Sequence, residues 1–553
     1  MQIYNTLSRT KEKFVPRQDK VVKMFVCGPT VYDYIHIGNA RTFVVFDVVA
    51  KYLRYKGYDV EYIQNITDID DKIIEQAKKK ADPTADTADI AKIASALAKE
   101  YSAYFMLDMS ALGVTAVTKY APASQYISQI INQVKRLIDK GHAYLIENDG
   151  YYFDLSTFPE YGKLSGRTTE MADDAVSRVD ENPNKRNRGD FALWKFSKPG
   201  EPSWQGVPVP DVAPAFGAKG QADCDIEISQ SATSQPRNNF GTGKAKAGDE
   251  QTNLSADIAR PRADIDSGLW HEGTGTMPKA ESVKDTGNFG TGTPGWHIED
   301  TAITETHFGP QYDLHGGGQD LIFPHHEAEI TQQESASGLK PFVKYWMHVG
   351  FLVNKDRKMS KSLGNFATAH ELLAKYRSEA LRFYLLSGYW RSPLDFSESL
   401  LDAAEAATIR IGEFMQRMKN IAESKIKGPA HDDKIAALKT DFEQEMDDDF
   451  NVPRALAVIF DFIKKLNISA DKGKISSEGA QKAVRTISDI NRVLSIVPAK
   501  GPEVPANIMA MVHEREALRQ TNNFDQADKI RQKILAAGWQ VEDTIYGPLV
   551  KLK

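Results

Sequence analysis

Two short motifs far apart in the chain combine residue types that can bind phosphate groups. His36 begins the motif HIGN, and Lys358 and Lys361 lie in the motif KMSKS. A histidine at a helix start can donate to a phosphate oxygen, and Gly38 lets the backbone approach closely. Two lysines can stabilise the charge that grows on a departing pyrophosphate. Each motif alone also fits a structural role, a helix cap for the histidine and a solvated loop for the lysines.

A cysteine precedes the first motif in a chain that has only two. Cys27 lies between an apolar run and a Gly-Pro turn, and Cys224 lies in ADCDIE. Two cysteines cannot build a disulfide framework, which predicts a reducing compartment and a cytoplasmic protein. The amino-terminal residues lack the apolar core of a signal peptide, and no apolar run is long enough to cross a membrane. We therefore expect no membrane association. The residues around Cys27 indicate a chemical role for this cysteine.

The residues around the first motif predict a βαβ unit. Residues 21–26, VVKMFV, predict a buried strand, residues 40–57 an amphipathic helix, and residues 59–64, DVEYIQ, the next strand. This order, with a glycine-containing turn after the first strand, favours a parallel sheet. A nucleotide binds such a sheet at the carboxyl ends of its strands, near a helix N-terminus, where His36 and Gly38 are expected.

The chain is too long for one core, and its composition changes along its length. It has 553 residues, of which 41% are hydrophobic and 26% charged, which is typical of a globular protein with several domains. Residues 205–293 are rich in small and polar residues and contain NFGTG twice, which predicts an insertion with little core. Residues 367–497 predict helices, and after a linker at 499–505 residues 506–553 predict one or two helices and a small hairpin. The net charge of −6 does not point to nucleic acid, although a local basic face could exist.

Longer strings around these motifs resemble the cysteinyl-tRNA synthetases, a family of class I aminoacyl-tRNA synthetases. The strings are CGPTVYDYIHIGNAR, NITDIDDKI, DFALWK, PGWHIE, LHGGGQDLIFPHHEAE and KMSKSLGN. The resemblance extends from NTLSRTKEKF near the start to FDQADKIRQKILAAGWQVED near the end, and only residues 205–293 fall outside it. Asn39 stands where the class I motif has a histidine, a variation that this family tolerates.

The resemblance implies an α/β fold with a Rossmann-type parallel-sheet catalytic domain, a connective insertion, a helical bundle and a small anticodon-recognition domain. The implied segments are the first half of the catalytic domain at 1–120, the connective peptide domain at 121–204, the low-complexity insertion at 205–293, the second half of the catalytic domain at 294–345, the KMSKS-containing stem-contact region at 346–400, the tRNA-binding helical bundle at 401–498 and the anticodon-recognition domain at 499–553. A monomer is usual in the family and is expected here.

The resemblance also implies an ATP-dependent ligase. The carboxylate of cysteine attacks the α-phosphate of ATP, and the terminal ribose hydroxyl of tRNA(Cys) then takes the cysteinyl group from cysteinyl-adenylate. Mg²⁺ accompanies ATP and bridges its phosphates. The implied catalytic residues are His36, Asn39, Lys358 and Lys361. The implied ATP-binding residues are Gly28, Pro29, Thr30, His36, Gly38, Gly316, Gly317, Gly318, Asp320, His348, Val349, Gly350 and Lys361. From the residues alone, the three glycines at 316–318 could be only a tight turn and Asp320 a helix cap.

Selecting cysteine over serine needs more than a shaped pocket, because the two amino acids have nearly the same shape. Zinc binds a thiolate strongly and a neutral hydroxyl weakly. In the family two cysteines, a histidine and a glutamate hold the zinc, and they correspond here to Cys27, Asp300, His325 and Glu329. The residues implied at the amino acid are Cys27, Thr67 and Trp296.

Position 300 departs from the family pattern, because GWHIEC reads GWHIED here. Asp300 could be a ligand itself, since carboxylates bind zinc and the charge of the ligand set stays the same. Cys224 could supply a thiolate instead, or zinc could be bound weakly or not at all. His325 and Glu329 are four residues apart and are expected on one face of a helix. We favour Asp300 as the ligand.

Two other functions stay open on the sequence. A related ligase joins cysteine to an amino-sugar inositol, but it lacks a tRNA-reading carboxyl-terminal domain, for which DDDFNVPRAL and NFDQADKIRQKI argue here. A non-catalytic paralogue that binds RNA or protein would fit the altered position 300, but not the intact HIGN and KMSKS motifs. Four basic residues on the predicted C-terminal helices could read RNA or form a solvated face, namely Arg515, Arg519, Lys529 and Arg531.

Overall fold

The computed structural model describes residues 1–82, 87–167, 182–197, 289–354, 357–358, 367–424, 426–498, 505–544 and 547–552. Cys224 and most of the predicted insertion lie outside these ranges, as does Lys361 of KMSKS, and Lys358 is described by its backbone alone. Within the described ranges, none of the helices has the length and apolar composition that a membrane span requires.

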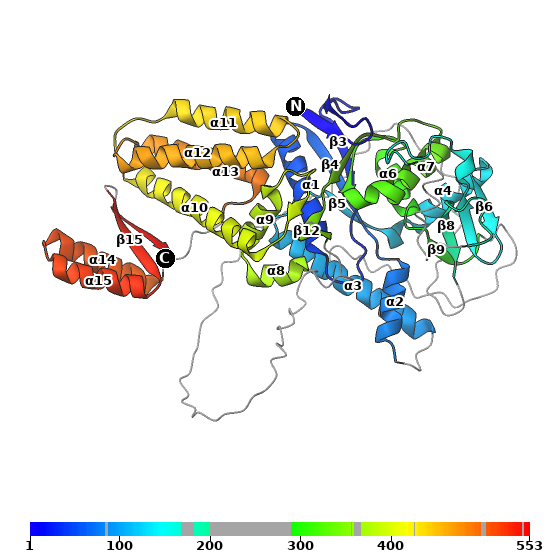
Figure 1. Cartoon of the computed structure of the whole chain (residues 1–553), viewed down its shortest axis with the longest axis horizontal. Coiled ribbons are helices and arrows are strands. Elements are labelled where there is room, and N and C mark those ends of the chain that lie inside the picture. Colours follow the sequence, from blue (N-terminus) through cyan, green and yellow to red (C-terminus); the bar gives the residue numbers. More distant parts are fainter. Residues whose placement is uncertain are drawn as a thin grey trace, which may run out of the picture. The chain divides into compact units, whose positions relative to one another are not determined.

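A parallel sheet of five strands carries the site (Figure 1). The strand order is β11-β10-β3-β4-β5, and every neighbouring pair is parallel. The bounds are β3 Val21–Val26, β4 Asp59–Ile66, β5 Lys119–Pro122, β10 Tyr312–Gly318 and β11 Val343–Val349. Both strands predicted from the first motif's surroundings are confirmed, and so is their parallel pairing. The chain order reverses between β3 and β10, which is where open parallel sheets bind ligands.

Helix α1, Ile37–Tyr55, follows the first motif and is buried along most of its length. The sheet covers one side, and helices α9, Ser378–Ser387, and α13, Ser477–Leu494, pack against it elsewhere. Contact on several sides explains why the sequence of α1 is almost continuously apolar. His36 is its N-cap, with Nδ1 accepting from the Gly38 N–H at 2.9 Å.

A second, antiparallel sheet has three strands in the predicted connective region, 121–204, and its fourth strand outside that region. Its strand order is β6-β7-β8-β9, with bounds β6 Ala143–Ile146, β7 Gly150–Phe153, β8 Phe191–Phe196 and β9 Gly292–Pro294. Strands β8 and β9 pair although more than ninety residues separate them along the chain. The two ends of the intervening segment therefore meet at one sheet edge, as an insertion requires. The other helices before residue 338 are α2 Asp71–Lys80, α3 Thr87–Ala111, α4 Ile127–Asp139, α6 Ile298–Phe308 and α7 Glu327–Ser337.

The region after residue 367 is helical, as predicted. Its helices are α8 Ala369–Lys375, α9, α10 Glu398–Glu423, α11 Asp432–Asp447, α12 Val452–Asp471 and α13. Helix α10 packs against α9 and α13, and α11 packs against α12 (Figure 1). The smaller strands are β1 Gln2–Asn5, β2 Thr10–Lys13, β12 Leu352–Asn354, β13 Arg357–Lys358 and β14 Leu394–Asp395.

The C-terminal segment has a small core of its own. It contains α14 Ala506–Gln520, α15 Phe524–Ala536, β15 Trp539–Thr544 and β16 Gly547–Leu552, and the strands form the predicted hairpin. Arg515 is fully buried and forms two 2.7 Å hydrogen bonds with the Asp543 carboxylate. The suggestion that Arg515 reads RNA is therefore wrong, because this side chain holds the helix against the hairpin.

A buried ion pair joins the sheet layer to the helical region. Arg382 of α9 and Asp47 of α1 are in direct contact, and neither side chain is more than 1% exposed. The guanidinium also donates to the carbonyls of Leu112 at 2.9 Å and Leu494 at 2.6 Å. Asp47 further accepts from Lys51 and from two backbone N–H groups after α3. One side chain pair thus ties together α1, the end of α3, α9 and α13.

We expect Arg382→Met to lower the free energy of unfolding by about 3–5 kcal/mol, because it leaves a buried carboxylate without its main cation. Chemical and thermal unfolding of the full chain measure the change. Arg492→Met is the matched control, since that side chain is 82% exposed and should shift stability by less than about 0.5 kcal/mol. Equal unfolding midpoints for the two variants would contradict the assignment.

Candidate active site

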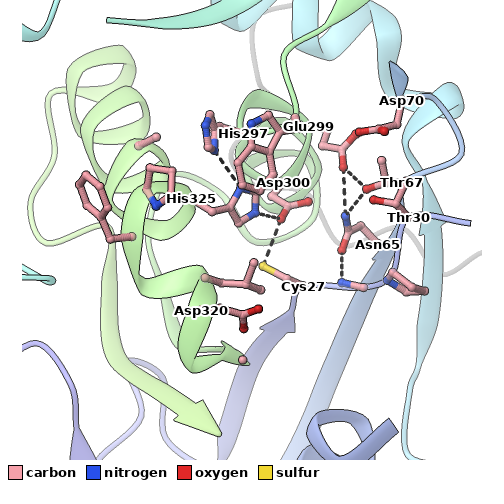
Figure 2. A pocket seen from close by; sticks show the side chains of 18 of the residues that line it. Cys27, Thr30, Asn65, Thr67, Asp70, His297, Glu299, Asp300, Asp320 and His325 are labelled. Carbon is pink, nitrogen blue, oxygen red and sulfur yellow. Dashed lines mark hydrogen bonds and ion pairs between the residues drawn. The ribbon is translucent and has the colours of Figure 1, made fainter. Parts of the chain in front are cut away.

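A pocket lies where the sheet order reverses, at the carboxyl ends of β3 and β4 (Figure 2). Most of the residues expected at a site line it. From the predicted set these are Cys27, Gly28, Pro29, Thr30, His36, Gly38, Asn39, Thr67, Trp296, Asp300, Gly318, Asp320, His325, Val349 and Gly350. Segments that lie hundreds of residues apart in sequence thus form one cavity.

Four residues of the predicted set, Gly316, Gly317, His348 and Glu329, do not line the pocket. A Cβ on Gly316 would lie 2.2 Å from the Phe46 ring, and one on Gly317 would lie 2.7 Å from the His326 ring. These two positions therefore need glycine for packing. Their contact with ATP, and that of buried His348, stays a prediction.

Four predicted metal ligands converge beside the pocket. The Asp300 carboxylate oxygen Oδ2 lies 3.2 Å from Cys27 Sγ and 3.1 Å from His325 Nε2. Glu329 Oε1 lies 3.0 Å from His325 Nε2 and 3.8 Å from Cys27 Sγ. Ligand atoms about 2.0–2.3 Å from a tetrahedral zinc are about 3.3–3.8 Å apart, so one of these separations lies in that range and the other three are slightly shorter, which is close to the spacing around one ion.

The burial of these side chains also fits a metal. All four are at most 5% exposed, and Asp300 Oδ1 and Glu329 Oε2 have no hydrogen-bond partner within the described part of the chain. His325 lies in a π-helical turn, Ile322–His326, and Glu329 in the following α7, so they meet across a junction rather than on one regular helix face as expected. Buried carboxylate oxygens without a partner are costly unless a cation accompanies them.

His326 offers a second possible ligand set that sequence reasoning missed. Its Nε2 lies 3.0 Å from Cys27 Sγ, and ligand atoms of Cys27, His325, His326 and Glu329 all lie within 4.8 Å of one another. The other ring nitrogen, Nδ1, lies 2.7 Å from His348 Nε2. The paired histidines of FPHHE were the available signal.

Acidic side chains are concentrated in this part of the pocket. Burial raises the pKa of the Cys27 thiol, and the charges of Asp300 and Glu329 raise it further. Burial followed by Asp300 raises the pKa of both Glu329 and Glu299. Burial lowers the pKa of three surrounding histidines and so keeps them neutral, namely His297, His315 and His326. A divalent cation would offset the acidic charge that these neutral rings cannot balance.

Two aromatic neighbours hold the His325 ring in place. Trp296 stacks on it with ring centroids 4.3 Å apart and an angle of 13° between the planes. His297 Nδ1 lies 2.8 Å from His325 Nδ1, which leaves Nε2 directed toward Asp300 and Glu329 (Figure 2). A partner at the other ring nitrogen is what orients a metal-binding histidine.

A second group of polar side chains lies across the pocket from the His325 ring. Thr67 Oγ1 donates to Glu299 Oε1, and Asn65 Nδ2 donates to the same oxygen at 3.3 Å (Figure 2). Asn65 Oδ1 accepts from the Gly28 N–H at 2.5 Å, and a Cβ on Gly28 would lie 1.8 Å from the Asn65 carbonyl oxygen. Sequence reasoning missed Asn65 and Glu299, although each lies within two residues of an expected site residue.

Arg41 is another residue that sequence reasoning missed. It is fully buried in α1 and donates to the carbonyls of Gly350 at 2.7 Å, Ser392 at 3.0 Å and Tyr389 at 3.1 Å. Burial lowers its pKa to about 10, so it stays charged at neutral pH. Arg41 therefore positions the pocket-lining segment at Gly350 relative to the HIGN motif.

Comparison with known proteins identifies the family. The family described as tRNA synthetases class I (C) catalytic domain matches residues 13–216 and 219–406, and a DALR domain matches residues 441–498. The cysteine–tRNA ligase of Clostridioides difficile strain 630 is 36% identical over 554 residues, covering 99% of both chains. That of Trichlorobacter lovleyi is 38% identical over 581 residues and covers 100% of both.

The fold and these matches place the chain in the class I tRNA synthetases. Within that class it belongs to the cysteine–tRNA ligase family. The fold is also that of Mycobacterium tuberculosis methionyl-tRNA synthetase in complex with methionyl-adenylate, with a TM-score of 0.53 and 15% identity. That match covers 87% of this chain and 92% of the other.

We expect Arg41→Lys to raise KM for ATP about tenfold, because a single ammonium cannot replace a guanidinium that donates to four backbone carbonyls in two segments. ATP-dependent pyrophosphate exchange measures KM. Arg54→Lys on the same helix is the control, since Arg54 is exposed and donates to the Val60 carbonyl away from the pocket. An unchanged KM in a folded Arg41→Lys protein would show that the position of the Gly350 segment does not depend on the hydrogen bonds of Arg41.

Proposed function

We propose that this member of the cysteine–tRNA ligase family activates cysteine with ATP and transfers it to the 3′-terminal adenosine of tRNA(Cys). The observation that carries the proposal is the convergence of Cys27, Asp300, His325 and Glu329 beside the pocket that residues of the HIGN motif line. A metal site that can recognise a thiol is therefore part of the pocket in which ATP phosphates would be held.

Zinc is the ion that this donor set supports best. One thiolate, one imidazole and two carboxylates are all accepted zinc ligands, and their spacing suits a tetrahedral site. When bound, zinc supplies a Lewis acid that accepts the substrate sulfur as a thiolate and discriminates against a serine hydroxyl. Asp300 would be the fourth protein ligand and His326 a neighbour. Asp300 Oδ2 lies 3.2 Å from Cys27 Sγ and 3.1 Å from His325 Nε2. His326 Nε2 lies 3.0 Å from Cys27 Sγ but 3.9 Å from Glu329 Oε1, and this longer separation favours Asp300.

The ATP roles follow from where the motif residues lie. One pocket is lined by His36 and Gly38 at the start of α1, by Gly318 and Asp320 at and just after the end of β10, and by Val349 at the end of β11. These positions would hold the adenosine and the phosphates, with Mg²⁺ bridging phosphate oxygens. Lys358 and Lys361 would neutralise the leaving pyrophosphate, and Asn39 would assist His36.

Transfer to tRNA is supported by the length of the relatives' match. The cysteine–tRNA ligases match this chain over its whole length, including the C-terminal segment that a ligase for a small amino-sugar acceptor would not need. In that segment Lys529 and Lys533 are exposed on α15 and lie four residues apart on one helix face, which suits contact with anticodon phosphates.

The function predicts cysteine-dependent ATP–pyrophosphate exchange and charging of tRNA(Cys) by the full chain, with serine activated at least about 100-fold less efficiently. Filter assays with labelled pyrophosphate and labelled cysteine measure the two steps. A variant that ends at residue 498 should keep the exchange and lose the charging. Absence of exchange in the full-length, zinc-supplemented protein would refute an active ligase, and equal loss of both steps in the truncated variant would make the C-terminal segment structural.

We expect Asp300→Ala to weaken zinc binding by more than about 100-fold, because it removes a ligand, while His326→Gln keeps the ion. Elemental analysis after dialysis against a graded chelator series gives the retained zinc per chain. Asp300→Cys, which restores a thiolate, should retain zinc against stronger chelators than the natural chain. The opposite pattern, with zinc lost from His326→Gln and kept by Asp300→Ala, would assign His326 as the fourth ligand.

A further inference from the structure

Glu299 has one carboxylate oxygen that the protein leaves without a hydrogen bond. The side chain is 2% exposed, and its Oε1 accepts from Thr67 and Asn65. The other oxygen, Oε2, has no partner among the residues that the structure describes. Glu299 also lines the pocket together with Trp296 and Asp300. A buried carboxylate oxygen without a partner, on a residue that lines a ligand cavity, calls for a donor from the ligand.

The acidic residues around Glu299 favour a positively charged donor. Asp300, Asp70 and Asp68 all add negative charge near it. Glu299 and Asp300 occupy the first turn of α6, where the helix N-terminus stabilises negative charge. The turn therefore holds two carboxyl groups side by side, of which Asp300 faces Cys27 and His325 while Glu299 faces Thr67 and Asn65 (Figure 2).

We propose that Glu299 Oε2 accepts a hydrogen bond from the α-ammonium group of the substrate cysteine. This inference rests on the proposed function, which places the substrate sulfur at the metal site beside Asp300. Only the α- and β-carbons separate the ammonium group of cysteine from its sulfur, so the two groups need subsites close together. Two successive residues of one helical turn provide such a pair of subsites.

Two other carboxylates near the pocket are less suited to the ammonium group. Asp68 accepts from both the backbone N–H and the hydroxyl of Ser124, at 2.9 and 2.5 Å. Asp70 lines the pocket, but its Oδ1 caps α2 by accepting from the Lys72 N–H at 2.8 Å. Glu299 differs from Asp68, both of whose oxygens have partners, and from Asp70, which is only half-buried, because Glu299 is buried with one oxygen held by Thr67 and Asn65 and the other unpaired within the described residues.

The test compares cysteine with 3-mercaptopropionate, which keeps the thiol and the carboxylate but lacks the amine. In zinc-loaded Glu299→Gln, the amide oxygen can still accept from Thr67 and Asn65, while an NH₂ group replaces Oε2. We expect the dissociation constant of cysteine to rise about 10- to 100-fold, as for loss of a charged hydrogen bond. Calorimetry should find 3-mercaptopropionate binding changed less than about twofold, with zinc content and ATP affinity unchanged.

Glu305→Gln is the matched control, because it removes a carboxylate from the same helix that pairs with Arg136 and does not line the pocket. If Glu299→Gln does not fold, Glu299→Asp serves instead, since its shorter carboxylate should weaken cysteine and spare 3-mercaptopropionate. The inference is overturned if either Glu299 variant keeps the natural preference for cysteine, or if Asp70→Asn alone abolishes it. A natural chain that fails to bind cysteine refutes the proposed function itself.

Discussion

The parallel pairing of β3 with β10 is the interaction on which the site depends. It places Met24 opposite Leu314 and Val26 opposite Gly316, and the Cys27 N–H then donates to the Gly316 carbonyl at 3.0 Å. Two chain segments almost three hundred residues apart are thereby joined at the point where the strand order reverses. Position 316 needs glycine because the Phe46 ring fills the space beside it, where any side chain would collide. Everything that the second segment contributes, including His325 and Glu329, is positioned relative to Cys27 through this contact.

The first turn of α6 shows how neighbouring carboxylates can take different roles. Asp300 lies among a thiol and an imidazole, whereas Glu299 lies beside a hydroxyl and an amide. Both are buried, so each needs either a cation or hydrogen-bond donors to offset its desolvation. The helix N-terminus contributes to both, but it cannot replace a counter-ion for two charges at once. The pocket is therefore built to be neutralised by what binds in it.

Local patterns were enough to predict the elements that follow a strong periodicity. Strands β3 and β4, the helical region after residue 367 and the C-terminal hairpin were all expected from the sequence. The positions of the metal ligands came from the family resemblance, and the structure brings all four together. Arg41 and Glu299 could not be predicted, because their partners are backbone carbonyls and side chains that only the fold brings near. The prediction for Arg515 was wrong for the same reason. A basic residue on a helix is expected to face solvent or RNA, and the sequence does not show that its partner is Asp543.

The exchange of cysteine for aspartate at position 300 changes the donor atom without changing the charge of the site. A carboxylate is a harder donor than a thiolate, so it gives less electron density to a bound zinc and leaves the ion a stronger acceptor for the substrate sulfur. The same property weakens the hold of the protein on the metal. Asp300 also has a second oxygen, Oδ1, which has no hydrogen-bond partner in the described part of the chain and can contribute to the same ion. Cys27 is the one thiol among the four converging side chains. It is therefore the only soft donor atom that this set of ligands offers to a metal ion.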